Sequence, residues 1–287
     1  MNGIDFILEH EPTLRLGGFI AVLLSLAIAE RLWPARGDAR PARRQLANLG
    51  LVALDTAVLR LAFPLLAVVL AIEVDARGGG LLGAIDAPLW VEIVLALLLF
   101  DLALYWQHRL LHSIALLWPL HRVHHSDTAF DVTTGVRFHP VEIALSMTIK
   151  LALVVVLGPH PVAVVIFEVL LSASSLLTHA DFALPPRVDR VLRWFIVTPS
   201  MHRIHHSIRR EETDSNYSFN LSLWDRVFGS YRACPKQPER EMPIGLPQWR
   251  DPVALGLWPL LLQPFRRPPA ALAPTDSNAR EEDRPNA

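Results

Sequence analysis

Long apolar runs separated by short polar segments are the feature that most restricts how this chain can fold. A helix needs about 20 mostly apolar residues to cross a bilayer. Three runs have this length, at residues 14–33, 46–72 and 88–106, and the second contains Pro64, where we expect a bend. Hydrophobic residues make up 52% of the chain and charged residues only 19%. The charged fraction is below the roughly 25% of a soluble protein, which favours a membrane protein.

A fourth apolar run, residues 141–178, is interrupted by "GPHP" at 158–161. Glycine and proline end helices, so this run predicts a tight helical hairpin, although residues 143–157 are short for a full crossing. The predicted fold class is all-α, a polytopic membrane helical bundle of about three spans plus a helical hairpin. The N-terminal segment is acidic and no small-residue cleavage site follows residues 14–33, so we expect this run to remain as an anchor.

Basic residues predict how the bundle is oriented. The loop after the first run contains Arg36, Arg40, Arg43 and Arg44. Loops rich in arginine stay in the cytoplasm. Counting passes from this loop, the third run ends in the cytoplasm, and the hairpin leaves the cytoplasm and returns to it. We therefore predict an integral membrane protein with a cytoplasmic helical cap.

The last part of the chain is rich in proline. Residues 251–267 are apolar but cut by prolines. We expect this segment to lie on the membrane surface, with a buried core segment as the alternative. Residues 268–287 have no periodicity and predict a disordered tail. Residues 1–267 are thus predicted to form a single membrane-embedded domain.

Two bulk properties exclude classes of ligand. The net charge of −1 gives no general attraction to nucleic acid, so no nucleic-acid partner is expected. The single cysteine, Cys234, excludes an intrachain disulfide and any metal site with several cysteines.

A repeated histidine cluster is the clearest sign of chemistry. The stretch "HRVHHS" at 121–126 returns as "HRIHHS" at 202–207, and a third box, "HRLLH", lies at 108–112. Residues three and four apart share a helix face, so the first histidine of each box points the same way as the later ones. Converging neutral imidazoles suit first-row transition metals. The boxed histidines are His108, His112, His121, His124, His125, His202, His205 and His206.

The number of histidines predicts two metal ions. Zinc sites use about three or four protein ligands, fewer than the boxes supply. The H-E-x-x-H motif of helical metalloproteases is missing from the sequence. An all-nitrogen shell with open positions suits redox iron, while the spacing leaves zinc and manganese as alternatives.

Several stretches around the boxes carry a resemblance. They are "DLALYWQHRLLH", "WPLHRVHHS", "VRFHPVE" at 136–142 and "NYSFNLSLWDRVFGSYR" at 216–232. With them, the motif core 90–232 resembles the fatty acid hydroxylase/sterol desaturase superfamily of integral membrane di-iron oxygenases. Ser218 departs from the pattern, because glycine is expected after the tyrosine.

The resemblance implies that the eight boxed histidines are ligands of two iron ions. It adds His179, in "LLTHADF", as a further ligand, with an interfacial histidine at a helix end as the alternative. Ser175 stands where some relatives have one more histidine. The resemblance implies no catalytic residue beyond the metal centre.

Partners of the ligand histidines are also expected. A metal-bound imidazole usually donates its second N–H to a carboxylate or a carbonyl. The candidates are Asp101, Asp127, Asp181 and Asp225, and a simple helix-end carboxylate is the alternative for Asp101. His139 is either a ligand, a partner of a ligand, or a structural residue at the turn before Pro140.

The resemblance further implies an oxidoreductase that uses dioxygen to hydroxylate or desaturate a C–H bond of a lipid, such as a fatty acyl chain or a sterol. The sequence has no motif for a bound flavin, haem or nucleotide, so electrons are expected from a separate protein of the ferredoxin or cytochrome/reductase type. The alternative is a redox-inert zinc-binding membrane hydrolase or metal-handling protein. A metal carrier should place its ligands near the bilayer midplane, whereas these boxes lie at helix ends.

Overall fold

The computed structural model describes residues 3–85 and 87–269, and it confirms the all-α prediction. Within these ranges the chain forms α-helices and short 3₁₀ helices, and its extended pairing is limited to isolated β-bridges. Most of the predicted disordered tail, residues 270–287, lies outside the described residues.

Five helical segments of the described chain are long and apolar enough to cross a membrane, in agreement with three spans plus a hairpin. A short helix, α1 (Gly3–Glu9), precedes them. The most apolar stretch of α2 buries none of its residues inside the protein, as expected for a helix that faces lipid. The five segments are α2 (Glu11–Leu32), α3 (Ala42–Ala62) with its continuation α4 (Ala67–Ala76), α5 (Leu89–Ser113), α7 (Pro140–Leu157) and α8 (Pro161–His179).

Two helix ends differ from the sequence-based expectation. The bend expected at Pro64 is a complete break, because the residue before a proline avoids the helical conformation. Phe63 is accordingly extended, with φ −119° and ψ 104°. The third span does not stop at Trp106 but continues to Ser113. Its additional turns carry His108 and His112.

The predicted hairpin forms at "GPHP". Gly158 ends α7 in the left-handed region, with φ 56°. A Cβ atom at this position would lie 2.0 Å from the carbonyl oxygen of Gly79, so the close approach of the two segments requires glycine. Pro161 then stands in the first turn of α8, where its missing N–H costs nothing. Helices α4, α5, α7 and α8 share an apolar core that includes Ala71, Phe100, Val154 and Phe167.

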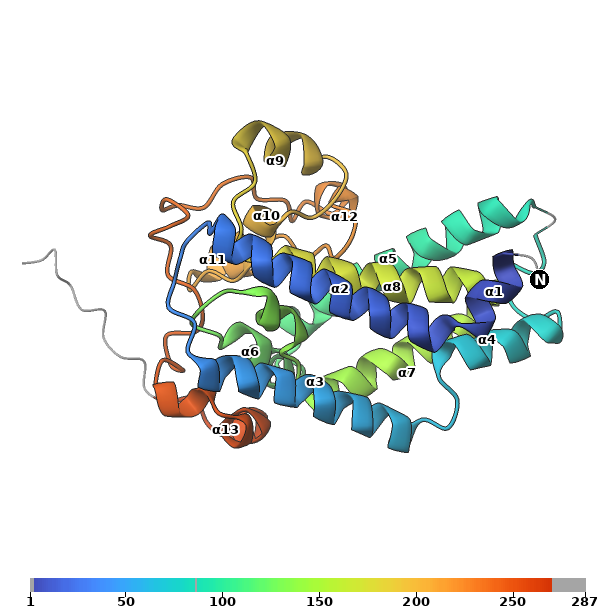
Figure 1. Ribbon diagram of the computed structural model, residues 1–287, viewed down its shortest axis with the longest axis horizontal. Coiled ribbons are helices and arrows are strands. Elements are labelled where there is room, and N and C mark those ends of the chain that lie inside the picture. Colours follow the sequence, from blue (N-terminus) through green and yellow to red (C-terminus); the bar gives the residue numbers. More distant parts are fainter. Residues whose placement is uncertain (1–2, 86, 270–287) are drawn as a thin grey trace, which may run out of the picture.

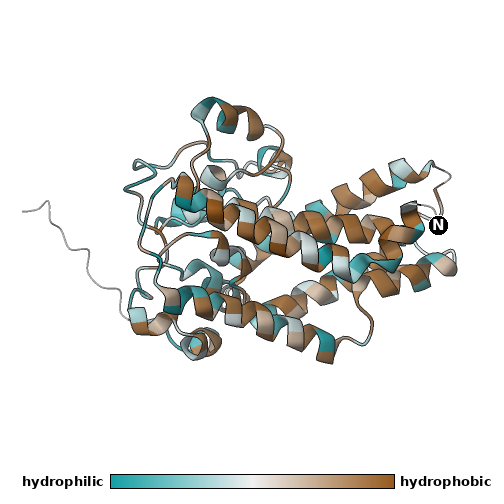
Figure 2. Cartoon of the chain, viewed as in Figure 1, coloured by the Kyte–Doolittle hydropathy of each residue, from teal (hydrophilic) through white to brown (hydrophobic). Residues whose placement is uncertain are grey.

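Short helices gather at one end of the bundle, on the left of Figure 1, and we call this part the cap. Figure 2 shows that the cap is more hydrophilic than the long helices. Its helices are α6 (Trp118–His125), η1 (Val132–Val136), α9 (Pro186–Leu192), α10 (Pro199–His205), α11 (Arg210–Thr213) and α12 (Leu223–Val227).

The arginine-rich loop between α2 and α3 lies at the capped end of the bundle (Figure 1). It is tied there by Asp181, which follows α8. Arg40 forms an ion pair of 2.9 Å with this carboxylate, and the backbone N–H of Arg36 donates to it over 3.0 Å. The loop and the ends of α5 and α8 are therefore on one side of the bundle, as counting passes predicted.

Residues 251–267 form broken helical turns against the bundle. They are η2 (Pro252–Leu255), α13 (Leu257–Leu262) and η3 (Gln263–Phe265). Leu260 is buried against α3 and α6, whereas Trp258 is 75% exposed and Phe265 is 73% exposed. This combination of a packed face and an exposed apolar face is typical of a segment at a membrane surface.

Candidate metal centre

Four helices bring nine histidines to the junction of bundle and cap. The end of α5 carries one box, α6 carries the second, and α10 with its C-terminal cap residue carries the third. The last residue of α8 is His179. Proline in the first turn starts both α6 and α10, and Thr198 caps α10 by accepting the N–H of Met201 over 3.3 Å.

The nine histidines form two groups, and in each group the nitrogen atoms lie within 4.8 Å of one another. The first group is His108, His112, His121, His125 and His205. The second group is His124, His179, His202 and His206. All eight boxed histidines and His179 are thus brought together, and His10, His139 and His160 belong to neither group.

Each H-x-x-H-H box contributes to both groups. In α6, the outer histidines His121 and His125 join the first group, and His124 joins the second. In the α10 box, the outer pair His202 and His206 joins the second group, and His205 joins the first. The i, i+4 pairs share a helix face and the middle histidine points elsewhere. The sequence-based expectation that all three histidines of a box point the same way was therefore too simple.

One ring nitrogen of every histidine in the first group has no hydrogen-bond partner among the described residues. Nε2 of all five histidines is buried and unpaired. A buried polar atom without a partner is costly, and five that converge have no stabilising arrangement of their own. A cation at their centre would satisfy all five, so these residues fit a metal ion.

In the second group, the Nε2 atoms have more close contacts with one another than their N–H groups can satisfy. Nε2 of His179 lies 3.0 Å from Nε2 of His124, 3.0 Å from Nε2 of His202 and 3.2 Å from Nε2 of His206. A neutral imidazole carries only one N–H, so one nitrogen cannot make three such hydrogen bonds. A metal ion among these four atoms would remove the conflict, and the second group also fits a metal.

The other ring nitrogen, Nδ1, is fixed by an acceptor in five histidines. When Nδ1–H donates, Nε2 keeps its lone pair for a metal. The acceptors are the carbonyl of Tyr217 for His108 (2.7 Å), of Arg137 for His124 (3.2 Å), of Ser175 for His179 (2.7 Å) and of Ser215 for His205 (2.7 Å), and Glu142 for His121 (2.7 Å).

Glu142 is a functional residue that the sequence reasoning missed. It stands in the first turn of α7 and is 3% exposed. Its Oε1 accepts from His121, and its Oε2 has no partner among the described residues. The sequence did carry a signal for it, because Glu142 is a carboxylate within an apolar run, two residues after "VRFHP". Ionisable residues in such runs usually serve a function.

His139 lies outside both groups and has a structural place. It caps α7, where its Nδ1 accepts the N–H of Val141 over 3.2 Å. Its Nε2 lies 3.2 Å from the carbonyl of Leu261, and this contact connects the N-terminus of α7 to α13. Of the roles considered for His139, the structural one at the turn before Pro140 matches this geometry.

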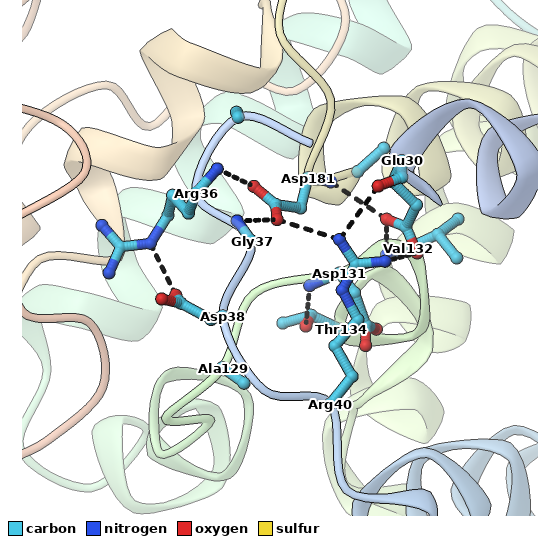
Figure 3. A network of polar contacts seen from close by, with 12 residues as sticks. Glu30, Arg36, Gly37, Asp38, Arg40, Ala129, Asp131, Val132, Thr134 and Asp181 are labelled. Carbon is cyan, nitrogen blue, oxygen red and sulfur yellow. Dashed lines mark hydrogen bonds and ion pairs between the residues drawn. The ribbon is translucent and has the colours of Figure 1, made fainter. Parts of the chain in front are cut away.

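The four candidate aspartates hydrogen-bond no histidine of the two groups in the described part of the chain. Asp127 pairs with Arg44, and Asp101 accepts from Asn220, Leu221 and Trp224. Figure 3 shows Asp181 bound to the Arg36–Gly37 backbone and to Arg40. Asp225 accepts the N–H groups of Tyr217 and Ser218. These carboxylates therefore fix the loops around the centre. Asp225 does so directly beside a ligand, because it binds the backbone of Tyr217, whose carbonyl accepts from His108.

Burial favours the neutral form of the three histidines of the α10 box. Loss of solvent lowers the pKa of His202 and His206 well below the usual value, and neighbouring imidazoles lower it further. Burial likewise lowers the pKa of His205 to about 3, although its hydrogen bond to Ser215 acts in the opposite direction. Neutral imidazole is the form that binds metals.

An apolar cavity of about 310 Å³ reaches both groups from the long helices. His108 and His121 of the first group line it, as do His124 and His202 of the second. The apolar wall comes from all five long segments and includes Phe19, Val52, Leu104, Ile143 and Leu171. A molecule that entered between the helices would thus meet both groups at once.

Comparisons with known proteins agree with this geometry. Residues 93–230 match the fatty acid hydroxylase family. An ornithine lipid hydroxylase of Rhizobium tropici is 32% identical over 183 residues, which is 63% of this chain and 52% of the relative. Human alkylglycerol monooxygenase is 32% identical over 133 residues, 46% of this chain and 29% of the relative. Rat lathosterol oxidase is 29% identical over 148 residues, 50% of this chain and 47% of the relative.

The matched segment thus spans about half the length, or less, of these relatives. No solved structure gives a significant match to the chain.

Proposed function

We propose that the chain is a membrane-bound di-iron oxidoreductase of the fatty acid hydroxylase family, whose model residues 93–230 match, and that it hydroxylates or desaturates a C–H bond of a lipid. The observation that supports this most is the pairing of two histidine groups, which fit two metal ions, with one apolar cavity that opens on both. The names of the relatives, which include an ornithine lipid hydroxylase and a lathosterol oxidase, favour a lipid as the substrate.

In this proposal the first group holds one iron ion and the second group holds the other. When bound, the two ions supply the activation of dioxygen. Ser175, which stands where some relatives have one more histidine, does not act as a ligand in this proposal, because its hydroxyl donates to the carbonyl of Gly135 over 2.6 Å. The second ion therefore has four imidazoles where the first has five. The imidazoles hold the ions, and in five of them the Nδ1–H group is engaged by an acceptor.

The chain's own residues position the lipid and keep water away from it. The apolar wall of the cavity excludes water from the lipid, and the helices hold the lipid against the histidines. Residues 1–267 act as one membrane-embedded unit in this proposal, since the spans, the cap and the segment 251–267 all border the same centre.

We place the cap in the cytoplasm. The arginine-rich loop lies at the capped end of the bundle, and loops of this kind stay in the cytoplasm. The electron donor is proposed to be a separate protein of the ferredoxin or cytochrome/reductase type that approaches this end. One cysteine cannot ligate an iron–sulfur cluster, so the chain does not supply such a centre itself.

The test combines metal analysis with lipid analysis. Protein purified without dioxygen should contain about two iron ions per chain. A strain that lacks the gene should lack a lipid that differs from its precursor by one oxygen atom or two hydrogen atoms, and the intact gene should restore it. His124→Ala and His205→Ala each remove one ligand, from different groups, and should abolish the restoration while the protein still inserts in the membrane.

His10→Ala is the matched control, because His10 belongs to neither group and stacks on Phe6 near the N-terminus. It should restore the lipid fully. Protein that contains zinc instead of iron, together with unchanged lipids in the deletion strain, would exclude the oxidoreductase and favour the zinc alternative.

A further inference from the structure

Asp55 is a buried carboxyl group without a partner. It lies in the middle of α3 and is 5% exposed. Its Oδ1 is buried and makes no hydrogen bond with any described residue, and no ion pair reaches the side chain. Leaving a carboxyl group in an apolar span without a partner costs free energy, so a structural role does not explain it.

This side chain lines the cavity of about 310 Å³ that opens on the histidines. Glu142 lines the same cavity and leaves Oε2 unpaired there, while its other oxygen is engaged by His121. No lysine or arginine is among the described residues that line this cavity. Apart from the histidines, the unpaired buried polar atoms of the described lining are therefore carboxyl oxygens, and the lining offers no lysine or arginine to an anionic group.

The chamber continues into a narrower apolar cavity of about 170 Å³ between α3, α5, α7 and α8. Both cavities are bordered by Leu59, Leu104, Gln107, Ile143, Ser146 and Leu171. Lys150 also lines this second cavity, but its ammonium group is paired with Glu168 over 2.7 Å. A lipid that reaches the histidines thus has a mainly apolar space for its chain in one cavity and two unsatisfied carboxyl groups in the other.

We propose that Asp55 binds a hydrogen-bond-donating polar group of the lipid, an ammonium or a hydroxyl, and so determines which lipids enter. Asp55 is then a specificity residue of the site, and it selects against anionic groups such as carboxylate or phosphate. The polar end of the lipid, rather than the end of its tail, lies in the chamber that the histidines line. This inference rests on the proposed function, because it assumes that the cavity holds the lipid to be oxidised.

Binding without turnover tests the proposal. The full-length protein in lipid nanodiscs, kept free of dioxygen, is titrated with hexadecylamine, hexadecanol, palmitate and hexadecane, which share one chain length. Wild-type protein should bind the amine or the alcohol at least about tenfold more tightly than palmitate and hexadecane, which is about the effect of one buried hydrogen bond. A stronger effect for the amine identifies an ammonium, and a stronger effect for the alcohol identifies a hydroxyl.

Asp55→Leu should bind all four probes alike. Thr56→Val is the matched control: Thr56 lines the same cavity, but its hydroxyl already donates to the carbonyl of Val52 over 2.8 Å. This variant should keep the preference. Equal loss in both variants, a preference retained by Asp55→Leu, or tightest binding of palmitate by the wild type would overturn the assignment.

Thermal stability separates a binding role from a structural one. Asp55→Leu removes an unpartnered buried carboxyl group, so its melting temperature should equal or exceed that of the wild type. A clearly lower value would show that Asp55 stabilises the fold and would overturn the proposal. The binding measurement involves no oxidation, so its outcome can be separated from that of the proposed function. If the protein shows the Asp55-dependent preference but oxidises no lipid, the proposed function is contradicted, while the assignment of Asp55 as a binding residue stands.

Discussion

Glu142 is the only carboxylate that hydrogen-bonds a histidine of either group in the described part of the chain. Its negative charge stabilises the Nδ1–H of His121 and makes the other nitrogen a better donor to a metal. The side chain comes from α7, whereas His121 comes from α6, so one contact fixes the distance between two helices and the orientation of a ligand.

Replacing this carboxylate should weaken metal binding. Glu142→Gln keeps the size of the side chain and an acceptor oxygen but removes the charge, and we expect the affinity for iron to fall by about 10–100-fold. Dialysis against graded concentrations of a chelator, followed by measurement of retained iron, gives this affinity. Glu73→Gln changes an exposed glutamate of α4 and serves as the control. Equal iron retention in the two variants would show that the Glu142 charge does not support the site.

The loop between α6 and α7 is held by one buried arginine at the start of α3. The guanidinium of Arg44 is 0% exposed and binds two carboxylates at once. Its Nη1 lies 2.6 Å from Asp131, and its Nη2 lies 2.8 Å from Asp127. Asp131 in turn caps η1. The same loop contains Arg137, whose carbonyl accepts from His124. The first turn of α3 therefore sets the loop that orients a ligand of the second group.

Removing this arginine should destabilise the protein. Arg44→Met removes the cation that two buried carboxylates share, and breaking a buried ion pair typically costs about 3–5 kcal/mol. A large fall in the melting temperature of the detergent-solubilised protein is the expected result. The neighbouring Arg43 is exposed, and Arg43→Met removes the same charge without the buried pairs, so it should melt like the wild type. If the two variants melt at the same temperature, the network does not stabilise the loop.

The elements themselves could largely be predicted from the sequence. Hydropathy alone located the long helices, because a membrane span depends on the composition of one continuous segment. "GPHP" located the hairpin for an equally local reason. Helix ends were less certain: α5 continues past Trp106 since no glycine or proline stops it before Ser113.

The arrangement within the site depended on contacts between elements and was harder to predict. The boxes supplied eight of the nine histidines and the resemblance supplied His179, but neither predicted which of them share a group. That division depends on how α6 and α10 face each other. The aspartates were candidates because metal-bound imidazoles often donate to carboxylates, yet Asp101 and Asp181 bind other loops. Backbone carbonyl groups, which no motif marks, accept from four of the nine histidines instead.

For the whole molecule, the remaining question is which side of the membrane the cap faces. The capped end holds both histidine groups and the arginine-rich loop, and α4 ends at the opposite side of the bundle (Figure 1). The orientation of the cap decides which leaflet and which proteins of the cell lie next to the two histidine groups. Our proposal places this side in the cytoplasm.

The single cysteine of the chain allows a direct test. Cys234 is exposed in the cap segment that follows α12. A membrane-impermeant maleimide should label it in sealed inside-out vesicles, where the cytoplasmic face is accessible, and not in right-side-out vesicles. In a Cys234→Ser background, Arg77→Cys places a cysteine at the far end of α4, where the side chain is 75% exposed, and should give the reverse pattern. Labelling of Cys234 in right-side-out vesicles would put the metal centre on the external face and rule out a cytoplasmic electron donor.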